Sequence, residues 1–413
     1  MKLKKYKLGD IGEIRMCKRI LKSQTTTKGD IPFYKIGTFG KEADTFISRK
    51  IFNSYKERYN FPNKGDVLIS AAGTIGRCVI YNGEDSYYQD SNIVWVNNDE
   101  SIVLNDYLFY VLNNITWIPS KGSTILRLYN DDIRNKDFIV PNLEYQRVIA
   151  DTLKAIDKKI KLNRQINDNL EAMAKQLYDY WFVQFDFPNE EGKPYKSSGG
   201  ALVYNEELKR EIPQGWHCYE LNKWLEIKSG FAFKSETYIS KGKFKVVTIK
   251  NVQDHHLDTS SCDYVYEIPQ GMKEWCSLSV NDRLISLTGN CGRLCIVTEN
   301  DLLLNQRVGL LACNDEYIDY AYLLLSSEEY QTLSNNLAKG AAQANLSPVD
   351  LCKNIAVLPK LDVLEKFNRQ IKPIVASYIQ NEIQIAELTK QRDELLPLLM
   401  NGQASVNYHL SDD

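Results

Sequence analysis

The chain has 413 residues, which is long enough for two or three domains. With 43% hydrophobic and 25% charged residues it has an ordinary globular composition, and no apolar run approaches the roughly 20 residues that a membrane helix needs. The net charge of −2 does not by itself indicate a nucleic-acid-binding protein. The basic N-terminus leads into no apolar segment, which excludes a secretory signal, and the nine cysteines are scattered. We therefore expect reduced thiols in a cytoplasmic protein that does not contact a membrane.

Basic charge is concentrated in two stretches of the chain. Residues 1–80 contain 17 lysine and arginine residues against 7 acidic residues, and residues 223–250 contain 7 lysines against 2 glutamates. A local excess of this kind can face an anionic partner even when the whole chain is slightly acidic. A solvated charged face explains the same counts equally well.

Residues 1–141 are predicted to form a domain of mixed α and β structure. The runs VLISAA, RCVIYN and SNIVWV are rich in β-branched residues and predict strands. Gly73 and Gly76 follow the first run, at a place where a tight turn requires backbone freedom. A short helix is predicted at 104–114.

One long amphipathic helix is predicted at 142–183, a segment without Gly or Pro. Apolar residues and one asparagine recur every seven positions, a spacing typical of a helix that packs along a partner helix. These positions are Ile149, Ile156, Asn163, Leu170 and Leu177. Three more apolar residues are expected to widen the stripe, namely Ile160, Ile166 and Met173.

A connector rich in Pro, Gly and Ser follows at 184–215, and the arrangement then starts again. KGDVLISAAGTIGR at 64–77 matches VNDRLISLTGNCGR at 280–293 at seven of fourteen positions without a gap. Further matches, such as the Lys-Gly pairs that begin at 121 and 339, follow in the same order. The chain is therefore predicted to be a tandem duplication of one unit, a globular domain followed by a long helix.

The second copy carries the same kinds of element in a domain at 216–359. Its strand-like runs are KVVTIK, RLISLT and RLCIVT, and its turn glycines are Gly289 and Gly292. A helix is expected at 319–333. Another is expected to begin at Ser347-Pro348, where a capping hydroxyl precedes a proline.

A second long helix is predicted at 360–402, before a tail at 403–413. Two rows of residues repeat at seven or fourteen positions along it. The first row is Leu364, Ile371, Tyr378, Ile385 and Leu399, and the second is Phe367, Ile374, Asn381, Leu388 and Leu395. The predicted fold class is α+β: two similar α/β-mixed domains joined by two long antiparallel helices as a coiled coil, with a pseudo-twofold internal repeat.

Asn163 and Asn381 are equivalent by the repeat, and each lies near the middle of its helix. In an antiparallel pair with a pseudo-dyad, equivalent residues at mid-helix meet across the axis. We expect the two amides to hydrogen-bond to each other and to fix the register of the helices. The alternative is that both face solvent.

No motif of catalysis is found in the sequence. It contains no phosphate-binding G-x-x-x-x-G-K-[ST] loop, no dinucleotide fingerprint, and no [DN]-P-P-[YF] loop of adenine methyltransferases. The four histidines lack the spacing of metal ligands. The chain is predicted to be no enzyme and to hold no metal. The class of function that remains is recognition of a ligand. Two diverged domains on a rigid rod suit two half-sites on opposite strands of a DNA duplex.

Several sequence elements, taken in order, resemble the specificity subunit of type I restriction–modification systems, and the likeness covers essentially the whole chain. These elements are LYDYWFVQFDFP, GKPYKSSGG, IPQGW, SGFAFKS, KGDVLISAAGTIGR, KGAAQANLS and DELLPLLMNG. The first copy departs from the pattern, with KGSTILRLY where the second has KGAAQANLS.

The resemblance implies a non-catalytic subunit whose two target-recognition domains read a bipartite DNA site, with the helices setting the spacer. Its implied partners are double-stranded DNA, two methylation subunits and restriction subunits that dock on the helices. S-adenosylmethionine would be bound by the methylation subunits, and ATP and magnesium by the restriction subunits. None of these cofactors is expected in this chain.

DNA-contacting residues are expected beside the glycine turns and on the Lys-Gly loops, where Arg suits guanine and Asn or Gln suits adenine. The candidates for base contacts are Thr74, Arg77, Lys121, Ser123 and Arg127 in copy one, and Asn290, Arg293, Lys339, Gln343 and Asn345 in copy two. The candidates for phosphate contacts are Lys18, Arg19, Lys22, Lys28, Lys234 and Lys250. Arg77 and Arg293 also have a structural explanation, since a residue shared by domains that read different bases more often serves the fold.

Two other functions stay open on the sequence alone. The chain could be a coiled-coil protein–protein scaffold without sequence-specific DNA binding. It could also be a stand-alone DNA-modifying enzyme, which the missing motifs disfavour.

Overall fold

The structure is a computed structural model that describes residues 3–119, 126–338, 344–400 and 402–403. Internal contacts divide the chain into two compact units. Unit 1 comprises residues 1–159 and 388–413, and unit 2 comprises residues 160–387. Each unit therefore contains one of the two predicted domains together with parts of both long helices.

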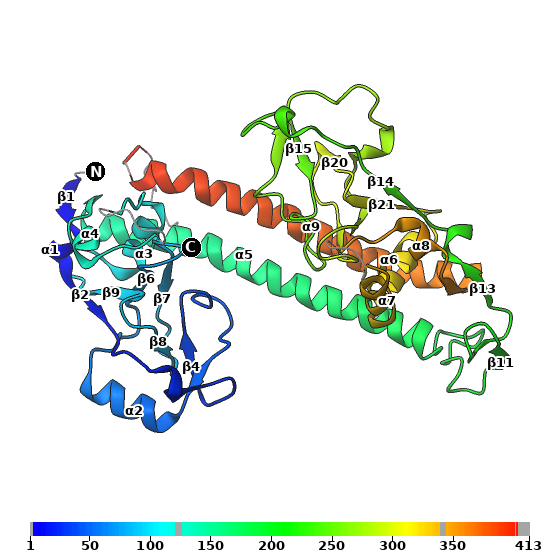
Figure 1. Cartoon of the computed structure of the whole chain (residues 1–413), viewed down its shortest axis with the longest axis horizontal. Helices are drawn as coiled ribbons and strands as arrows, with labels where there is room; N and C mark the ends of the chain where they lie inside the picture. The colour runs from blue at the N-terminus through cyan, green and yellow to red at the C-terminus, as the bar shows by residue number, and fades with distance from the viewer. Residues whose placement is uncertain (1–2, 120–125, 339–343, 401, 404–413) are drawn as a thin grey trace, which may run out of the picture. The chain divides into compact units, whose positions relative to one another are not determined.

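Unit 1 is built on a four-stranded antiparallel sheet with the strand order β2-β9-β6-β7 (Figure 1). Its strands are β2 (Gly12–Met16), β9 (Ile93–Asn98), β6 (Val67–Ser70) and β7 (Cys78–Ile80). A second sheet has the order β3-β5-β4-β8 and includes a parallel pair, β4 with β8. Its strands are β3 (Thr25–Thr26), β5 (Phe46–Ile47), β4 (Ile31–Tyr34) and β8 (Tyr87–Tyr88). Strands β1 (Lys4–Lys7) and β10 (Asp137–Val140) pair separately.

Unit 2 repeats this strand pairing. Its antiparallel sheet has the order β14-β21-β18-β19, made of β14 (Glu226–Ser229), β21 (Val308–Ala312), β18 (Arg283–Ser286) and β19 (Leu294–Ile296). Its second sheet again has one parallel pair, β15 with β20, and consists of β16 (Asp263–Val265), β15 (Phe244–Val247), β20 (Leu302–Leu304) and β17 (Ser277–Leu278). Two pairs remain, β13 (His217–Glu220) with β22 (Ile355–Leu358) and β11 (Leu202–Asn205) with β12 (Arg210–Pro213). The matching order confirms the internal repeat.

Short helices cover the sheets. Those of unit 1 are α1 (Leu8–Ile11), α2 (Arg49–Arg58), α3 (Asn105–Asn114) and α4 (Asn130–Arg134), and those of unit 2 are α6 (Ile318–Ser326), α7 (Glu328–Ala338) and α8 (Pro348–Cys352). The helix expected at 319–333 is divided at Ser327, whose extended backbone ends α6 and whose hydroxyl accepts a bond from the Tyr330 amide in α7. The predicted cap of α8 is confirmed, because the Ser347 hydroxyl accepts from the Asp350 amide at 3.2 Å.

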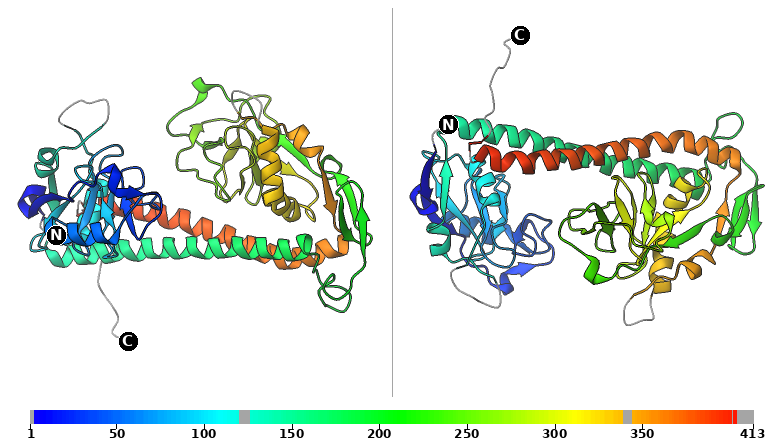
Figure 2. Two further views of the ribbon diagram at one scale, coloured as in Figure 1. Left: turned by 60° about the horizontal axis from the view of Figure 1, so that its bottom comes forward. Right: turned by 90° about the horizontal axis from the view of Figure 1, so that it is seen from above.

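The two long helices are α5 (Leu143–Tyr178), which ends in a π-helical turn at Asp179–Val183, and α9 (Leu361–Met400). In unit 1 the start of α5 shares a core with the end of α9, where Leu153 and Leu399 are both buried. In unit 2 the end of α5 lies beside the start of α9 (Figure 2), and the two share a core through Tyr178 and Phe367. The helices therefore run antiparallel, as predicted.

The aromatic end of α5 is firmly anchored in unit 2. Trp181 and Phe182 are buried, and the Phe182 ring lies 4.8 Å from the rings of both Phe367 and Tyr320. The aromatic run YDYWFVQFDF thus ends α5 in a packed core. In the part of the chain that the structure describes, no helix is both long and apolar enough to cross a membrane.

The apolar stripe of α5 differs from the predicted one in its second row. The first row, at Ile149 and every seventh residue after it, is buried or half-buried as expected. The second row runs through Leu153, Ile160, Asn167 and Ala174. Ile166 and Met173, which were expected to widen the stripe, are 38% and 52% exposed. The prediction omitted Asn167 because this residue is polar. Asn167 nevertheless lies seven residues after Ile160, at the position of the heptad that faces the partner helix.

The direct bond expected between Asn163 and Asn381 is also corrected. Asn163 donates to Gln384, with 3.2 Å between Nδ2 and Oε1, and Asn381 donates to Asn167 at 3.0 Å. Each asparagine therefore meets a different residue of the other helix. Asn167 also donates to Glu382 at 2.6 Å, which makes a buried polar layer inside unit 2.

We expect Asn167→Leu to destabilise unit 2 by roughly 1–3 kcal/mol, because the substitution leaves the Asn381 amide without its partner and removes one of the partners of the Glu382 carboxylate. The measurement is the midpoint of thermal unfolding, with the exposed Asn169→Leu on the same helix as the matched control. A variant as stable as the wild type would show that the polar layer does not hold the helix pair together.

Candidate nucleic-acid interface

The glycine turns predicted in both copies have the same geometry. In unit 1 the Ser70 hydroxyl donates to the Thr74 carbonyl at 2.5 Å and accepts from the Arg77 amide at 3.0 Å. In unit 2 the Ser286 hydroxyl makes the equivalent bonds to Asn290 and Arg293 at 2.5 and 3.0 Å. Both glycines of each turn have φ between 70° and 85°, which confirms the predicted need for backbone freedom.

Each turn is paired with the segment that follows the Lys-Gly loop. Two bonds, from Gly73 to Leu126 and from Leu128 to Ala71, flank a bridge between Ala72 and Arg127. In unit 2 the corresponding bonds flank a bridge between Thr288 and Asn345. The two elements expected to carry base contacts therefore form one structural motif in each unit.

The candidate residues at the tips of the turns differ in their surroundings. Thr74, Arg77 and Asn290 are exposed. Arg293 instead is half-buried and forms an ion pair with Asp254 at 3.1 Å and a hydrogen bond with Gln253. These contacts within the protein favour the structural explanation for Arg293. The base-contact candidates Lys121, Ser123, Lys339 and Gln343 lie outside the described residues.

A pocket of about 800 Å³ in unit 1 brings together three candidates from distant parts of the sequence. Arg19, Lys22 and Arg127 line it together with Lys35, and the acidic member of its described lining is Asp90. The remaining polar lining consists of hydroxyl and amide side chains, namely Thr25, Thr26, Thr27, Thr45, Gln89, Ser91 and Asn92. A cationic pocket with hydroxyl and amide walls has the chemistry that contacts phosphates and base edges.

Arg127 makes a hydrogen bond and a ring contact in this pocket. Its Nη2 donates to the Ser91 hydroxyl at 2.7 Å, and its guanidinium lies 5.9 Å from the centre of the Tyr129 ring. Lys35 forms an ion pair with Asp44 at 3.0 Å. A hydrogen bond from Thr45, and then this lysine, lower the pKa of Asp44. Arg19 and Lys22 are exposed at the rim.

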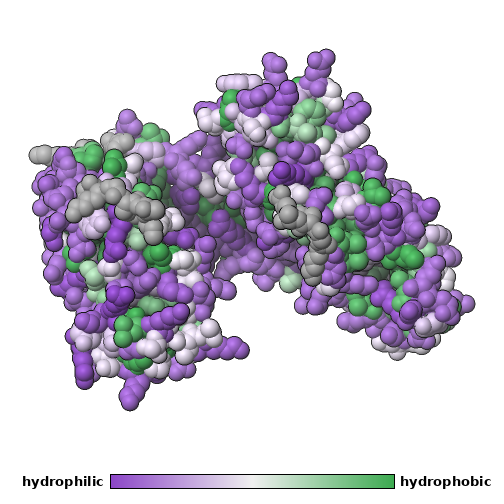
Figure 3. Space-filling model, in the orientation of Figure 1, coloured by the Kyte–Doolittle hydropathy of each residue, from purple (hydrophilic) through white to green (hydrophobic). Residues whose placement is uncertain are grey.

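The other phosphate candidates are placed on the surface. Lys18 lies 5.2 Å over the Tyr59 ring, and Lys250 forms an ion pair with Asp263 at 3.2 Å. Lys28 and Lys234 are exposed. Hydrophilic residues dominate the face of each unit drawn in Figure 3.

Sequence reasoning missed part of the pocket. Lys35, Ser91 and the threonines at 25–27 line it, yet none belongs to a repeated motif. The local signal was the run Thr25-Thr26-Thr27, a cluster of hydroxyls next to Lys22 and Lys28. Such a cluster is typical of any exposed loop, so it does not single out a binding site.

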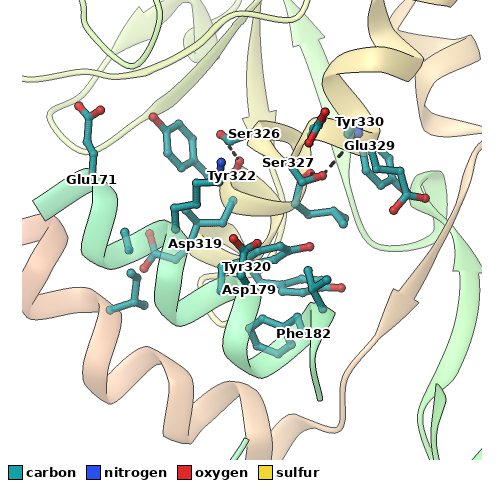
Figure 4. A pocket seen from close by; sticks show the side chains of 18 of the residues that line it. Glu171, Asp179, Phe182, Asp319, Tyr320, Tyr322, Ser326, Ser327, Glu329 and Tyr330 are labelled. Atoms are coloured by element: carbon teal, nitrogen blue, oxygen red, sulfur yellow. Dashed lines mark hydrogen bonds between the residues drawn. The ribbon is translucent and has the colours of Figure 1, made fainter. Parts of the chain in front are cut away.

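A second cavity of about 670 Å³ lies inside unit 2, between α5, α9 and the helices α6 and α7 (Figure 4). Its walls combine tyrosine and phenylalanine rings, among them Phe182 and Tyr320, with aliphatic and charged side chains. Asp319 is neutralised by Arg283 at 2.6 Å, and both side chains are almost fully buried. The cavity therefore combines an apolar wall with a compensated ion pair.

Glu171 on α5 is the perturbed acid of this cavity. Burial raises the pKa of Glu171 to about 7, and the neighbouring Asp168 and Glu382 act in the same direction. Glu382 in turn accepts from Asn167 and pairs with His256 at 3.3 Å. Glu382 thereby raises the pKa of His256.

Among the described residues, no cluster of three or more His, Cys, Asp or Glu side chains is arranged to hold a metal ion. All nine cysteines are free thiols, and burial raises the pKa of the Cys17 thiol to about 12.

The comparison with known proteins identifies the family. The family model described as "Type I restriction modification DNA specificity domain" matches residues 2–172 and again residues 213–392. The chain belongs to this family, and the family's domain is present twice.

Individual relatives agree with this assignment. The chain is 27% identical over 430 residues to the type I restriction enzyme MjaIX specificity subunit of Methanocaldococcus jannaschii, a match that covers 97% of this chain and 93% of that protein. A candidate type I restriction enzyme specificity subunit of Haemophilus influenzae is 50% identical over 181 residues, which is 43% of this chain and 46% of that protein. The fold is similar to a solved type I restriction–modification S subunit of M. genitalium, with a TM-score of 0.57 at 16% identity over 96% of each chain.

We expect Glu171→Gln to stabilise unit 2 at pH 8 and to have no effect at pH 4. The pKa of Glu171 is about 7 in the folded protein, above its ordinary value of 4.5, so the wild type loses stability as the pH rises through this range. A gain of roughly 1 kcal/mol corresponds to about 2–4 °C in the unfolding midpoint.

Unfolding curves of the Glu171→Gln variant and the wild type at both pH values are the test, with the exposed Glu365→Gln on α9 as the control. An equal difference at pH 4 and pH 8 would contradict the assignment of the raised pKa to Glu171.

Proposed function

We propose that this chain is the DNA-recognition subunit of a type I restriction–modification complex, and that each unit reads one half of a bipartite DNA site. The observation that carries the proposal is the turn-and-loop motif, which has the same backbone bonds in both units but different side chains at its tip. A shared backbone with diverged side chains is what two readers of unequal half-sites require. The double match to the family's DNA specificity domain supports the same function.

The cationic pocket of unit 1 supports DNA as the ligand. Arg19, Lys22 and Arg127 converge there although the whole chain has a net charge of −2. Local positive charge of this kind provides sequence-independent affinity for phosphates, while the amide and hydroxyl walls can select bases.

We further propose that the long helices set the spacing between half-sites and dock two methylation subunits. Leu162, Ile166 and Met173 on α5 are 53%, 38% and 52% exposed. Their spacing of four and seven residues places them on one face of the helix, beside the stripe that packs on α9. An exposed apolar row of this kind is typical of a surface that binds another protein.

In this proposal the chain performs no catalysis. S-adenosylmethionine belongs to the methylation subunits, and ATP and magnesium belong to the restriction subunits. The complex would work in the cytoplasm, where its DNA substrate lies, and the nine free thiols suit a reducing compartment.

The decisive experiment is a map of methylated adenines in DNA from cells that express this chain with its methylation subunit. One bipartite motif with a fixed gap, lost when the chain is omitted, is the expected result. Absence of methylation despite a stable complex with an active methylation subunit would favour the protein–protein scaffold. Modification or cleavage of DNA by the purified chain alone would favour a stand-alone enzyme.

We expect the double variant Arg19→Gln, Lys22→Gln to weaken DNA binding by a similar factor on all sequences. Each lost phosphate contact should reduce the slope of log affinity against log salt by about 0.9. The measurement is the affinity of the complex with its methylation subunit for specific and random duplexes at several salt concentrations.

The matched control for this double variant is Lys193→Gln, Lys196→Gln, which removes the same charge from two exposed positions of the connector. An unchanged salt slope in the pocket variant would show that Arg19 and Lys22 do not contact phosphate.

A further inference from the structure

Arg127 and Asn345 occupy the same position in the two units. Each is the residue that bridges the middle of its glycine turn, Arg127 to Ala72 and Asn345 to Thr288. The flanking backbone bonds are also equivalent, at 2.7 Å from Leu128 to Ala71 and 2.7 Å from Leu346 to Leu287. Residues that bridge two strands direct their side chains to the same face as their partners. We therefore expect Arg127 to point from its motif in unit 1 in the same direction as Asn345 points from its motif in unit 2.

Arg127 is held in an orientation suited to a planar partner. Both of its hydrogen bonds to Ser91 use Nη2, and the ring of Tyr129 lies beside the guanidinium. Among the contacts of the described residues, none uses Nη1 or Nε. A guanidinium presents parallel N–H groups along its Nε–Nη2 and Nη1–Nη2 edges, so a planar partner with two acceptors can bond to one of these edges and share Nη2 with Ser91.

The surroundings of this position differ in charge between the units. Strands β2 and β14 end at equivalent residues, since Met16 pairs with Val94 and Ser229 pairs with Gly309. Three residues further on, Arg19 of unit 1 corresponds to Ala232 of unit 2. Lys22, which opens a 3-10 helix, likewise corresponds to Ser235, which opens another. Two rim cations of unit 1 are thus neutral in unit 2.

Unit 2 carries positive charge at other places. Arg307 corresponds to Asn92, because their carbonyls accept equivalent bonds from Leu287 at 2.9 Å and from Ala71 at 2.8 Å. Arg307 is exposed and can contribute affinity for phosphate. The exposed amide of Asn345 carries no charge and is suited to selecting a base.

We infer that Arg127 and Asn345 are the residues that make the two half-sites different. Resting on the function proposed above, Arg127 donates to O6 and N7 of a guanine in the half-site of unit 1. Asn345 pairs with N6 and N7 of an adenine at the corresponding position in the half-site of unit 2. Arg19 and Lys22 flank the guanine-reading arginine and contact phosphate.

The test is a reciprocal exchange, Arg127→Asn and Asn345→Arg, each expressed with the wild-type methylation subunit and followed by mapping of methylated adenines. Arg127→Asn should relax or convert one guanine to adenine in one half-site, with discrimination against other bases changing roughly 5- to 150-fold. Asn345→Arg should introduce a guanine preference in the other half-site. In each variant the unaltered half-site should stay as in the wild type.

Two further variants keep the test decisive. Arg127→Lys retains the charge but not the planar pair of donors, so it should lose guanine selection while methylation continues. Arg134→Asn removes an exposed arginine of α4, paired with Asp131 outside the pocket, and should leave both half-sites unchanged. Thermal unfolding of each variant identifies a loss that comes from misfolding.

The outcomes separate this inference from the function on which it rests. A bipartite wild-type motif that Arg127→Asn and Arg127→Lys weaken equally at every base would overturn the inference, because Arg127 would then contact only phosphate. A motif that neither exchange alters would overturn it as well. Failure of the wild-type complex to methylate any bipartite motif would instead reject the proposed function itself.

Discussion

The pairing of α5 with α9 is the constraint on which the rest of the structure depends. Helices of 36 and 40 residues with an apolar stripe are stable in water only when that stripe is buried. Each unit buries its share with residues from both helices, Leu153 with Leu399 in unit 1 and Tyr178 with Phe367 in unit 2. The core of each unit is therefore completed by segments that lie far apart in the sequence.

The second organising feature is found at the glycine turns, where the bonds that fix the backbone are independent of the side chains that differ between the two units. One serine hydroxyl and two glycines fix each turn, and backbone bonds to the neighbouring loop fix its partner. Because these bonds do not involve the side chains of Arg127 or Asn345, those side chains can change without altering the loop. A duplicated domain can then change its recognised bases while its fold is maintained.

The polar and charged side chains of the two units fall into two groups. The buried Asn167 of the helix pair bonds to Asn381 and Glu382, whereas Arg19 and Lys22 remain exposed at the rim of the pocket. Buried polar groups without partners would destabilise the fold. Exposed cations beside hydroxyl groups are available to a ligand. The polar side chains that stabilise the helix pair and the exposed cations of the pocket thus lie in different parts of the chain.

The sequence by itself determined the features that depend on spacing along the chain: the seven-residue rows of α9, the duplication, the glycine turns and the capped start of α8. Helical periodicity and turn conformation are local properties, so the order of residues reveals them. Only the tertiary structure decided that Arg19, Lys22 and Arg127 share one pocket, that Arg293 is engaged by Asp254, and that Asn163 meets Gln384. These contacts join segments that lie far apart in the sequence. They depend on the register in which the strands and helices pack, which the order of residues does not reveal.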